Sequence, residues 1–213
     1  MTGLQGDVGR LPDGSPVDVD LSFQDVLEDL DAAGMIYASA TNDPWVSYVD
    51  FTHTRSSSTE ALGGILLDEA NVESETTTLA LAVGRAFART DRMTATAYVG
   101  ARAWWIDNTF ELRGVGGGSS RQSSSESWVD PLVGVTGQFE PTERWTLSGA
   151  LEVGGFGIGA DSEFSALAAA TYEVTEWFGI SFGWRHLQVD YDSGDTLYDV
   201  RQSGPLLGAT FVF

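Results

Sequence analysis

Charged side chains recur on the polar faces of strand-like segments, and they are the residues of this chain best suited to chemistry. Strand parity places five of them away from the apolar stripes, namely Asp50, Arg102, Asp130, Glu152 and Arg185. In a narrow interior, opposite charges form ion pairs and hydrogen bonds, because burial of an unpaired charge costs on the order of several kcal/mol. The same side chains along a wider passage select the solutes that pass. The pattern therefore predicts either a structural ion network or the lining of a channel.

Other residue types that carry chemistry are scarce. The histidines, His53 and His186, lack partners at metal-ligand spacing, and the chain has no cysteine. The glycine-rich run at 154–159 lacks the GxGxxG order of a dinucleotide loop and indicates close strand packing. The enzymatic alternative is a set of Ser181, His186 and Asp190 on the surface of a barrel. We expect no catalytic residue, no metal ligand and no cofactor, and hence no enzyme.

The composition excludes one large class of partner. The chain of 213 residues has a formal net charge of −20 and a pI of about 4.1. Such a field repels phosphate backbones, so we expect no nucleic-acid partner. No apolar run approaches the roughly 18 residues of a membrane-spanning helix. The mean hydropathy of −0.07 is nevertheless typical of a transmembrane barrel, in which polar and apolar side chains alternate.

The dominant periodicity along the chain is two, which is typical of β-strands. In 93–105 every residue of one face, from Met93 to Trp105, is apolar. Similar alternation recurs in 45–53, 79–87, 131–139, 145–153, 164–174 and 178–190. Short turns alternate with long polar links, of which 54–72 and 113–126 are rich in Ser, Gly and Thr. Short periplasmic turns and long extracellular loops are typical of an outer-membrane barrel.

The N-terminal part is compatible with two arrangements. Residues 1–16 lack periodicity and predict a flexible lead-in. Residues 17–23 alternate as a strand, whereas 22–34 follow a helical period. Nine strand-like segments follow residue 33, so a strand at 17–23 restores an even count of ten; the other option is eight strands with the N-terminal segment against the interior. We expect an all-β fold, a single antiparallel transmembrane β-barrel over 17–213 with ten strands and a short N-terminal helix.

Aromatic residues lie where the expected strands cross the two surfaces of a bilayer. We expect membrane-interface positions for Trp45, Trp105, Trp128, Trp145, Trp184 and Phe213. The chain ends on an apolar stripe formed by Leu207, Phe211 and Phe213. This stripe resembles the C-terminal signal that delivers outer-membrane barrels to their assembly machinery, which is therefore an expected partner.

Several segments resemble a family of uncharacterised proteobacterial outer-membrane proteins. They are VDVDLSFQDVLEDLD at 17–31, SWVDPLVG at 127–134, EVGGFGIGAD at 152–161, GWRHLQVDYD at 183–192 and YDVRQSGPLLGATFVF at 198–213. The resemblance implies a barrel in the outer membrane of a Gram-negative bacterium, in contact with its lipid and lipopolysaccharide. It implies no substrate. The first residues show no signal peptide, so we expect a mature chain.

Three functions are compatible with these features. The first is a narrow, porin-like passive channel for transport of small polar solutes or ions. The second is a closed structural barrel that interacts with partners through acidic extracellular loops. The third is a soluble, lipocalin-like binder of small molecules. No sequence feature names a solute.

Overall fold

The computed structural model describes residues 4–10, 16–21, 30–61, 67–114, 118–193 and 197–213. Its strands are β1 (Leu4–Arg10), β2 (Pro16–Leu21), β3 (Leu30–Asn42), β4 (Trp45–Ala61), β5 (Leu67–Arg89), β6 (Met93–Gly114), β7 (Ser119–Thr142), β8 (Trp145–Gly155), β9 (Ser162–Glu173), β10 (Phe178–Asp192) and β11 (Leu197–Phe211). All belong to one sheet in the order β2-β1-β11-β10-β9-β8-β7-β6-β5-β4-β3. The fold is therefore all-β and antiparallel, as the sequence predicts, and β3 to β11 form an up-and-down meander.

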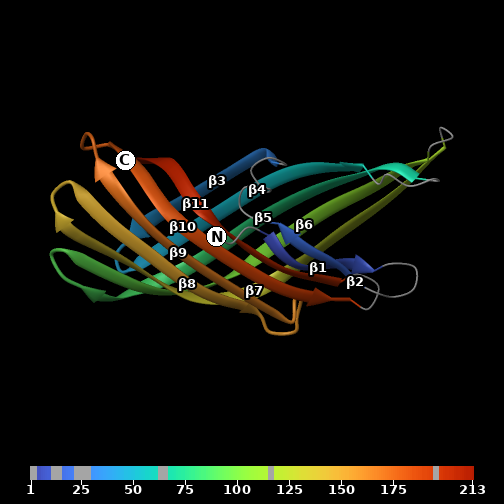
Figure 1. Cartoon of the computed structure of the whole chain (residues 1–213). Coiled ribbons are helices and arrows are strands. Elements are labelled where there is room, and N and C mark those ends of the chain that lie inside the picture. The colour runs from blue at the N-terminus through green and yellow to red at the C-terminus, as the bar shows by residue number, and fades with distance from the viewer. Residues whose placement is uncertain (1–3, 11–15, 22–29, 62–66, 115–117, 194–196) are drawn as a thin grey trace.

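The sheet is curled around a common interior (Figure 1). The short turns that follow β3, β5, β7 and β9 gather at one end, close to the C-terminus, and β4 to β7 extend far at the opposite end. We call these the short-turn end and the long-loop end. The sheet order ends at β2 and β3, so within the described ranges no backbone pairing joins β3 to β2 or β11.

The N-terminal region differs from the prediction. Strand β1 lies within 1–16, where we expected a flexible lead-in, because its backbone pairs with β11 from Leu4 to Val8. With β1, the described residues form eleven strands, whereas we expected ten. The strand expected at 17–23 is present as β2. Pairing with a tertiary neighbour can order a segment that has no periodicity of its own.

The expected N-terminal helix at 22–34 is not seen. Residues 22–29 lie outside the described residues, and the rest of the segment begins β3, where Gly34 pairs with His53 of β4. The ladder of hydrogen bonds to β4 overrides the local helical period there. The described part of the chain contains no helix, and thus none that could cross a membrane.

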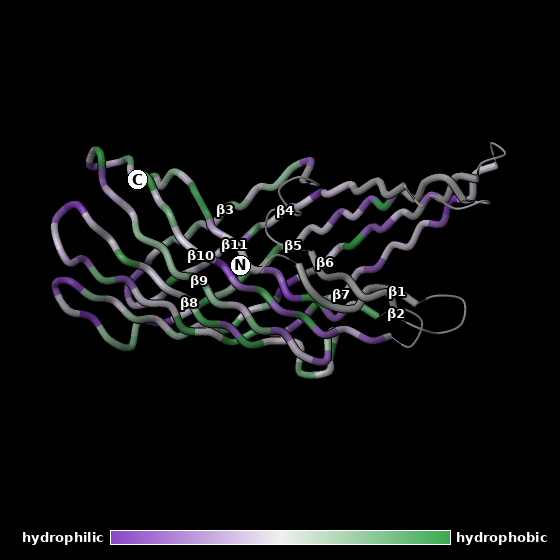
Figure 2. Tube along the Cα trace, in the orientation of Figure 1, coloured by the Kyte–Doolittle hydropathy of each residue, from purple (hydrophilic) through white to green (hydrophobic). Residues whose placement is uncertain are grey.

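Successive side chains of a strand point to opposite faces of the sheet. Hydrophilic and hydrophobic residues alternate along the strands (Figure 2). Val99 on the convex face exposes 57% of its surface, whereas its neighbour Tyr98 on the concave face exposes 6%. We call the apolar side chains of the convex face the outer belt; its exposed members include Val49, Leu81, Val99, Val133, Leu151 and Phe182. On β6 the belt runs from Met93 to Trp105. At roughly 3.3 Å per residue and a tilt of roughly 40°, it spans about 30 Å.

Two clusters of buried side chains fill the concave side. The aromatic cluster consists of Trp104, Ile106, Trp128, Ala160, Leu187, Val189, Tyr198 and Val200, with Tyr191 packed against it. The tyrosine cluster consists of Val46, Tyr48, Ala80, Tyr98 and Leu132. Along β6, Arg102 lies between members of the two clusters, and Asp130 does so along β7. The charged side chains therefore form a layer between two apolar ones.

Candidate functional site: a charged network in the interior

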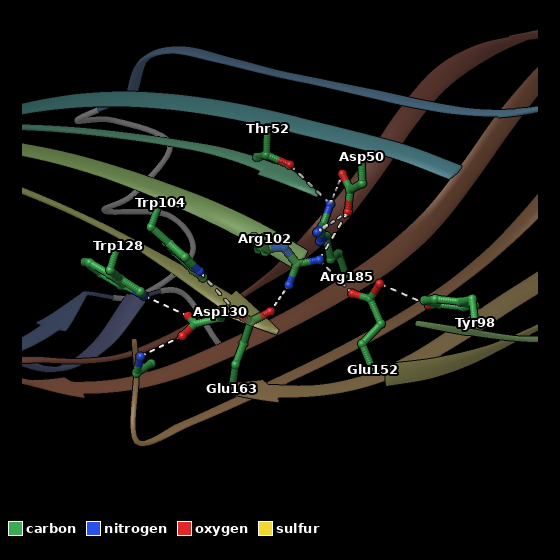
Figure 3. A network of polar contacts seen from close by, with 11 residues as sticks. Asp50, Thr52, Tyr98, Arg102, Trp104, Trp128, Asp130, Glu152, Glu163 and Arg185 are labelled. Atoms are coloured by element: carbon green, nitrogen blue, oxygen red, sulfur yellow. Dashed lines mark hydrogen bonds and ion pairs between the residues drawn. The ribbon is translucent and has the colours of Figure 1, made fainter. Parts of the chain in front are cut away.

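Arg102 is the centre of the charged layer, and its side chain is fully buried (Figure 3). Its Nη2 lies 2.7 Å from Glu152 Oε2 of β8 and 3.6 Å from Asp50 Oδ2 of β4. Its Nη1 donates to Glu163 Oε1 of β9. One guanidinium therefore holds carboxylates from three strands, which only a curled sheet brings together. Its Nε–H has no hydrogen-bond partner in the described structure.

Arg185 ties opposite sides of the curled sheet together. From β10 its guanidinium grips Asp50 of β4 with two bonds, Nη2 to Oδ2 at 2.6 Å and Nη1 to Oδ1 at 3.1 Å. The same Nη1 lies 3.2 Å from Thr52 Oγ1 and 3.0 Å from Met35 Sδ of β3. Bidentate pairs of this kind are strong and fix geometry. Because Asp50 also faces Arg102, it links the two arginines.

Asp130 is bound by neutral donors instead of a cation. It is the cross-strand partner of Arg102, yet its oxygens accept from Trp128 Nε1 at 2.7 Å and from the Ala160 backbone N–H at 2.6 Å. Ala160 lies in the tight loop between β8 and β9, which follows the left-handed Gly155 at φ 82°, the last residue of β8. A Cβ at Gly159 would come 2.5 Å from Asp130 Oδ1, so this close approach requires glycine.

Two aromatic side chains complete the hydrogen bonds of the glutamates. Tyr98 Oη donates to Glu152 Oε1 at 3.0 Å, and its ring covers Gly134, where a Cβ would come 2.5 Å from the ring. Trp104 Nε1 donates to Glu163 Oε2 at 3.2 Å. Both oxygens of each glutamate are thus bonded, which is the condition for burying such groups without a large loss of stability.

Stacked rings lie directly beside the charged layer on the long-loop side. Trp104 and Trp128 stack with ring centroids 5.5 Å apart and 11° between their planes. Tyr191 stacks on Trp128 at 4.0 Å and 10°. Because the indole N–H groups of these tryptophans bond the carboxylates of the layer, the stack and the network form one continuous structure.

The layer carries more negative than positive charge. Its cations are Arg102 and Arg185, and its carboxylates are Asp50, Asp130, Glu152 and Glu163. Neutral donors stabilise the excess carboxylates. Among the residues that the structure describes, no group of three or more His, Asp and Glu has the arrangement of a metal site. The arrangement can lock strands together and fill the interior.

All five charged residues proposed from the sequence lie on the concave face. Asp50, Arg102, Glu152 and Arg185 share the ion pairs, and Asp130 stands beside them without a cation. Sequence reasoning missed Glu163, because the expected strand at 164–174 starts two residues later than β9 does. The neighbouring Phe164 could have revealed it, because an outward Phe164 requires that residue 163 point inward.

The aromatic residues expected at the membrane interfaces do not all lie on the same face of the sheet. Trp45, Trp105 and Trp184 are exposed on the convex face, Trp145 is half-buried, and Phe213 is exposed at the C-terminus. Leu207 and Phe211 of the terminal stripe also point outward and are exposed. Placing Trp128 at a membrane interface was wrong, because it shares the inward face with Asp130 two residues away and bonds that carboxylate.

The enzymatic alternative does not assemble. His186 lies on the convex face, where its Nδ1 is 2.5 Å from Ser203 Oγ. Ser181 lies on the other face of the same strand and bonds Thr171 at 2.8 Å and Thr210 at 2.6 Å. With His186 and Ser181 on opposite faces of β10, they cannot act on one substrate.

Comparison with known proteins identifies similarity among solved structures alone. No protein-family model matches the chain, and no curated protein sequence matches it. Among solved structures, a NanC porin in a rhombohedral crystal form is similar at a TM-score of 0.34 and 11% identity, over 86% of this chain and 100% of that one.

Proposed function

We propose that this protein is an outer-membrane β-barrel with a closed interior, which anchors and displays the long-loop end rather than passing solutes. The outer belt supports the membrane location, because it is about as tall as the hydrocarbon core and carries Trp45, Trp105 and Trp184 on its exposed face. The short turns gathered at one end agree with the periplasmic turns of an outer-membrane barrel.

The observation that carries the closed interior is the burial of the charged layer and the stack beside it. Arg102 and Asp130 are 0% exposed, and Trp104 is 1% exposed. A conducting pore is lined by side chains that contact water. Here the mid-height side chains contact one another instead, so the interior is a packed core at that level.

A barrel in a bilayer can leave no sheet edge facing lipid, because each unpaired backbone group costs on the order of several kcal/mol there. In the meander β3 and β11 run in the same direction, so we propose that they meet as a parallel pair along 203–211, the part of β11 that β1 leaves without a second neighbour. The contacts from Arg185 to Asp50, Thr52 and Met35 support this, since they draw β10 against β3 and β4. Hydrogen exchange in vesicles should then show protection also of those β3 amides that point away from β4.

The long-loop end supports a role in surface interaction. Strands β5, β6 and β7 contain 23, 22 and 24 residues, about twice the roughly 9–11 that cross a bilayer. Residues 118–125 are exposed, with Arg121 among serines. These strands extend past the outer belt as a polar sheet and suit contact with partners outside the membrane.

Electrical recording in planar bilayers tests the proposal. Protein whose folding is verified by anomalous gel migration before boiling should give no steady conductance. Trp104→Ala, which removes the ring that bonds Glu163, should give measurable steps, whereas Trp177→Ala in the exposed β9–β10 turn should not. Stable steps from the unmodified protein would overturn the closed interior, and failure to insert into lipid would overturn the membrane location.

The second candidate is the narrow channel expected from the sequence. The observation that favours it is the row of hydroxyls from Thr171, Ser181 and Thr210 on the concave face near the short turns. Such a row can hold water and small solutes. On this alternative the unmodified protein conducts, and Arg185→Gln changes its ion selectivity.

A further inference from the structure

One arginine lies within the outer belt. Arg85 points outward from β5, between the outward Val83 and Phe87, and is exposed. Its cross-strand neighbours are Trp45 of β4 and Ala97 of β6, neither of which carries charge. A cation on a lipid-facing surface is costly unless it reaches a counter-charge at the membrane interface.

Two other arginines at the short-turn end, Arg89 and Arg144, already have partners within the protein. Arg89 Nη1 lies 2.8 Å from Asp43 Oδ1, and Arg144 Nη1 donates to Tyr172 Oη at 3.1 Å. Within the described residues Arg85 has no ion pair or side-chain hydrogen bond. Because an arginine stays protonated, its charge is available to an anion outside the described residues.

Arg85 borders an apolar groove on the convex face. The groove has a volume of about 700 Å³ and is lined by Trp45, Val83, Arg85, Val99, Val133 and Leu151, among others. It crosses the belt from β4 toward β9. Arg85 and Trp45 lie at its short-turn side, whereas the valines lie at mid-height. The groove thus combines an apolar trough with one cation and one interfacial indole.

We propose that this groove binds one anionic glycerophospholipid, with an acyl chain along the valines and the phosphate on Arg85. A guanidinium matches a phosphate with two parallel hydrogen bonds, and an indole favours the headgroup level. The inference rests on the proposed membrane location. It selects a phospholipid over lipopolysaccharide because the charged side of the groove faces the short turns, which are periplasmic in outer-membrane barrels.

Native mass spectrometry of the full chain in detergent, titrated with phosphatidylglycerol, tests this site. Arg85→Gln should weaken retention of the first lipid on the order of tenfold, because charge-assisted bonds to phosphate are lost. The matched control is Arg144→Gln, which removes the same charge at the same end but outside the groove, and it should retain lipid normally. Val133→Trp, which fills the trough and leaves Arg85 in place, should also weaken retention.

Three outcomes would overturn the site. They are equal retention by Arg85→Gln and Arg144→Gln, unchanged retention by Val133→Trp, and retention of lipopolysaccharide in place of phosphatidylglycerol. Flotation with phosphatidylcholine vesicles separates this failure from that of the proposed function. Protein that floats but shows no Arg85-dependent retention lacks the site, whereas protein that does not float lacks the membrane location itself.

Discussion

The two ends of the interior are built from different kinds of side chain. Toward the long loops, the aromatic cluster packs without gaps to water, and Trp104 and Val189 are 1% and 2% exposed. Toward the short turns, Thr171, Ser181 and Thr210 are half-buried and bond one another. Large rings exclude water, whereas a row of small hydroxyls leaves room for it. The dry packing therefore extends from the long-loop end through the charged layer to the tyrosine cluster, and the hydroxyl row lies beyond it.

The position of the charged layer between the aromatic cluster and the tyrosine cluster strengthens its ion pairs. Arg102 has the aromatic cluster on one side, so its pairs with Glu152 and Glu163 are poorly screened. Removal of one partner of an ion pair then leaves an uncompensated charge in a dry environment. In the hydroxyl row near the short turns, water can replace a lost partner.

The largest expected effect comes from removing the central cation of the charged layer. Arg102→Ala should lower the free energy of unfolding by about 3–5 kcal/mol, because it strands Glu152 and Glu163 without their cation. Urea titrations of protein in vesicles measure the change. The control is Arg89→Ala, which removes an exposed ion pair with Asp43 and should cost about 0–1 kcal/mol. Similar losses for the two variants would mean that the layer is wet.

A second prediction tests the convex face near the level of the charged layer. Val99→Arg places a charge at the middle of the outer belt and should cost about 2–4 kcal/mol in vesicles. The matched control is Ser125→Arg, on the convex face of β7 but beyond the belt, at about 0–1 kcal/mol. Refolding titrations in lipid compare them, and equal costs would contradict the position of the belt.

A third prediction tests the wet half. Ser181→Ala removes the hydroxyl that bonds both Thr171 and Thr210, and it should cost about 0.5–1.5 kcal/mol. Ser47→Ala, at an exposed convex position, should cost less. The same urea titrations apply. A loss as large as that of Arg102→Ala would show that the two halves are equally dry.

The smallest effect is expected past the belt at the long-loop end. Burial raises the pKa of Asp190, and Asp199, its direct cross-strand partner, raises it further. A raised carboxyl pKa in the folded state destabilises at neutral pH, and this penalty vanishes once the pH falls below the pKa of the unfolded chain. Asp190→Asn should therefore stabilise by about 0.2–1 kcal/mol at pH 7 and by nothing at low pH.

A double-mutant cycle isolates the cause of that effect. Asp199→Asn alone should give a gain of similar size, and the double variant should gain less than the sum of the two, because either substitution removes the repulsion. Thermal or urea unfolding across pH measures it. Additive gains would mean that the two carboxyls do not interact.

Much of the fold follows from local alternation. Side chains of a strand must alternate between two faces, so the apolar stripe from Met93 to Trp105 determines that Arg102 points the other way. The same argument placed Asp50, Glu152 and Arg185 inward without knowledge of any contact. Where it was not applied, as for Trp128 beside Asp130, the expected position was wrong.

The sequence by itself thus determined which face each central charge occupies, because parity is a property of one strand. Only the tertiary structure decided which charges meet, because that depends on the stagger and curl of several strands. Asp130 shows the difference: its register partner is Arg102, yet a loop from between β8 and β9 brings the N–H of Ala160 to its carboxylate. Strand β1 is a second example, because it forms by pairing with β11, a segment at the other end of the chain.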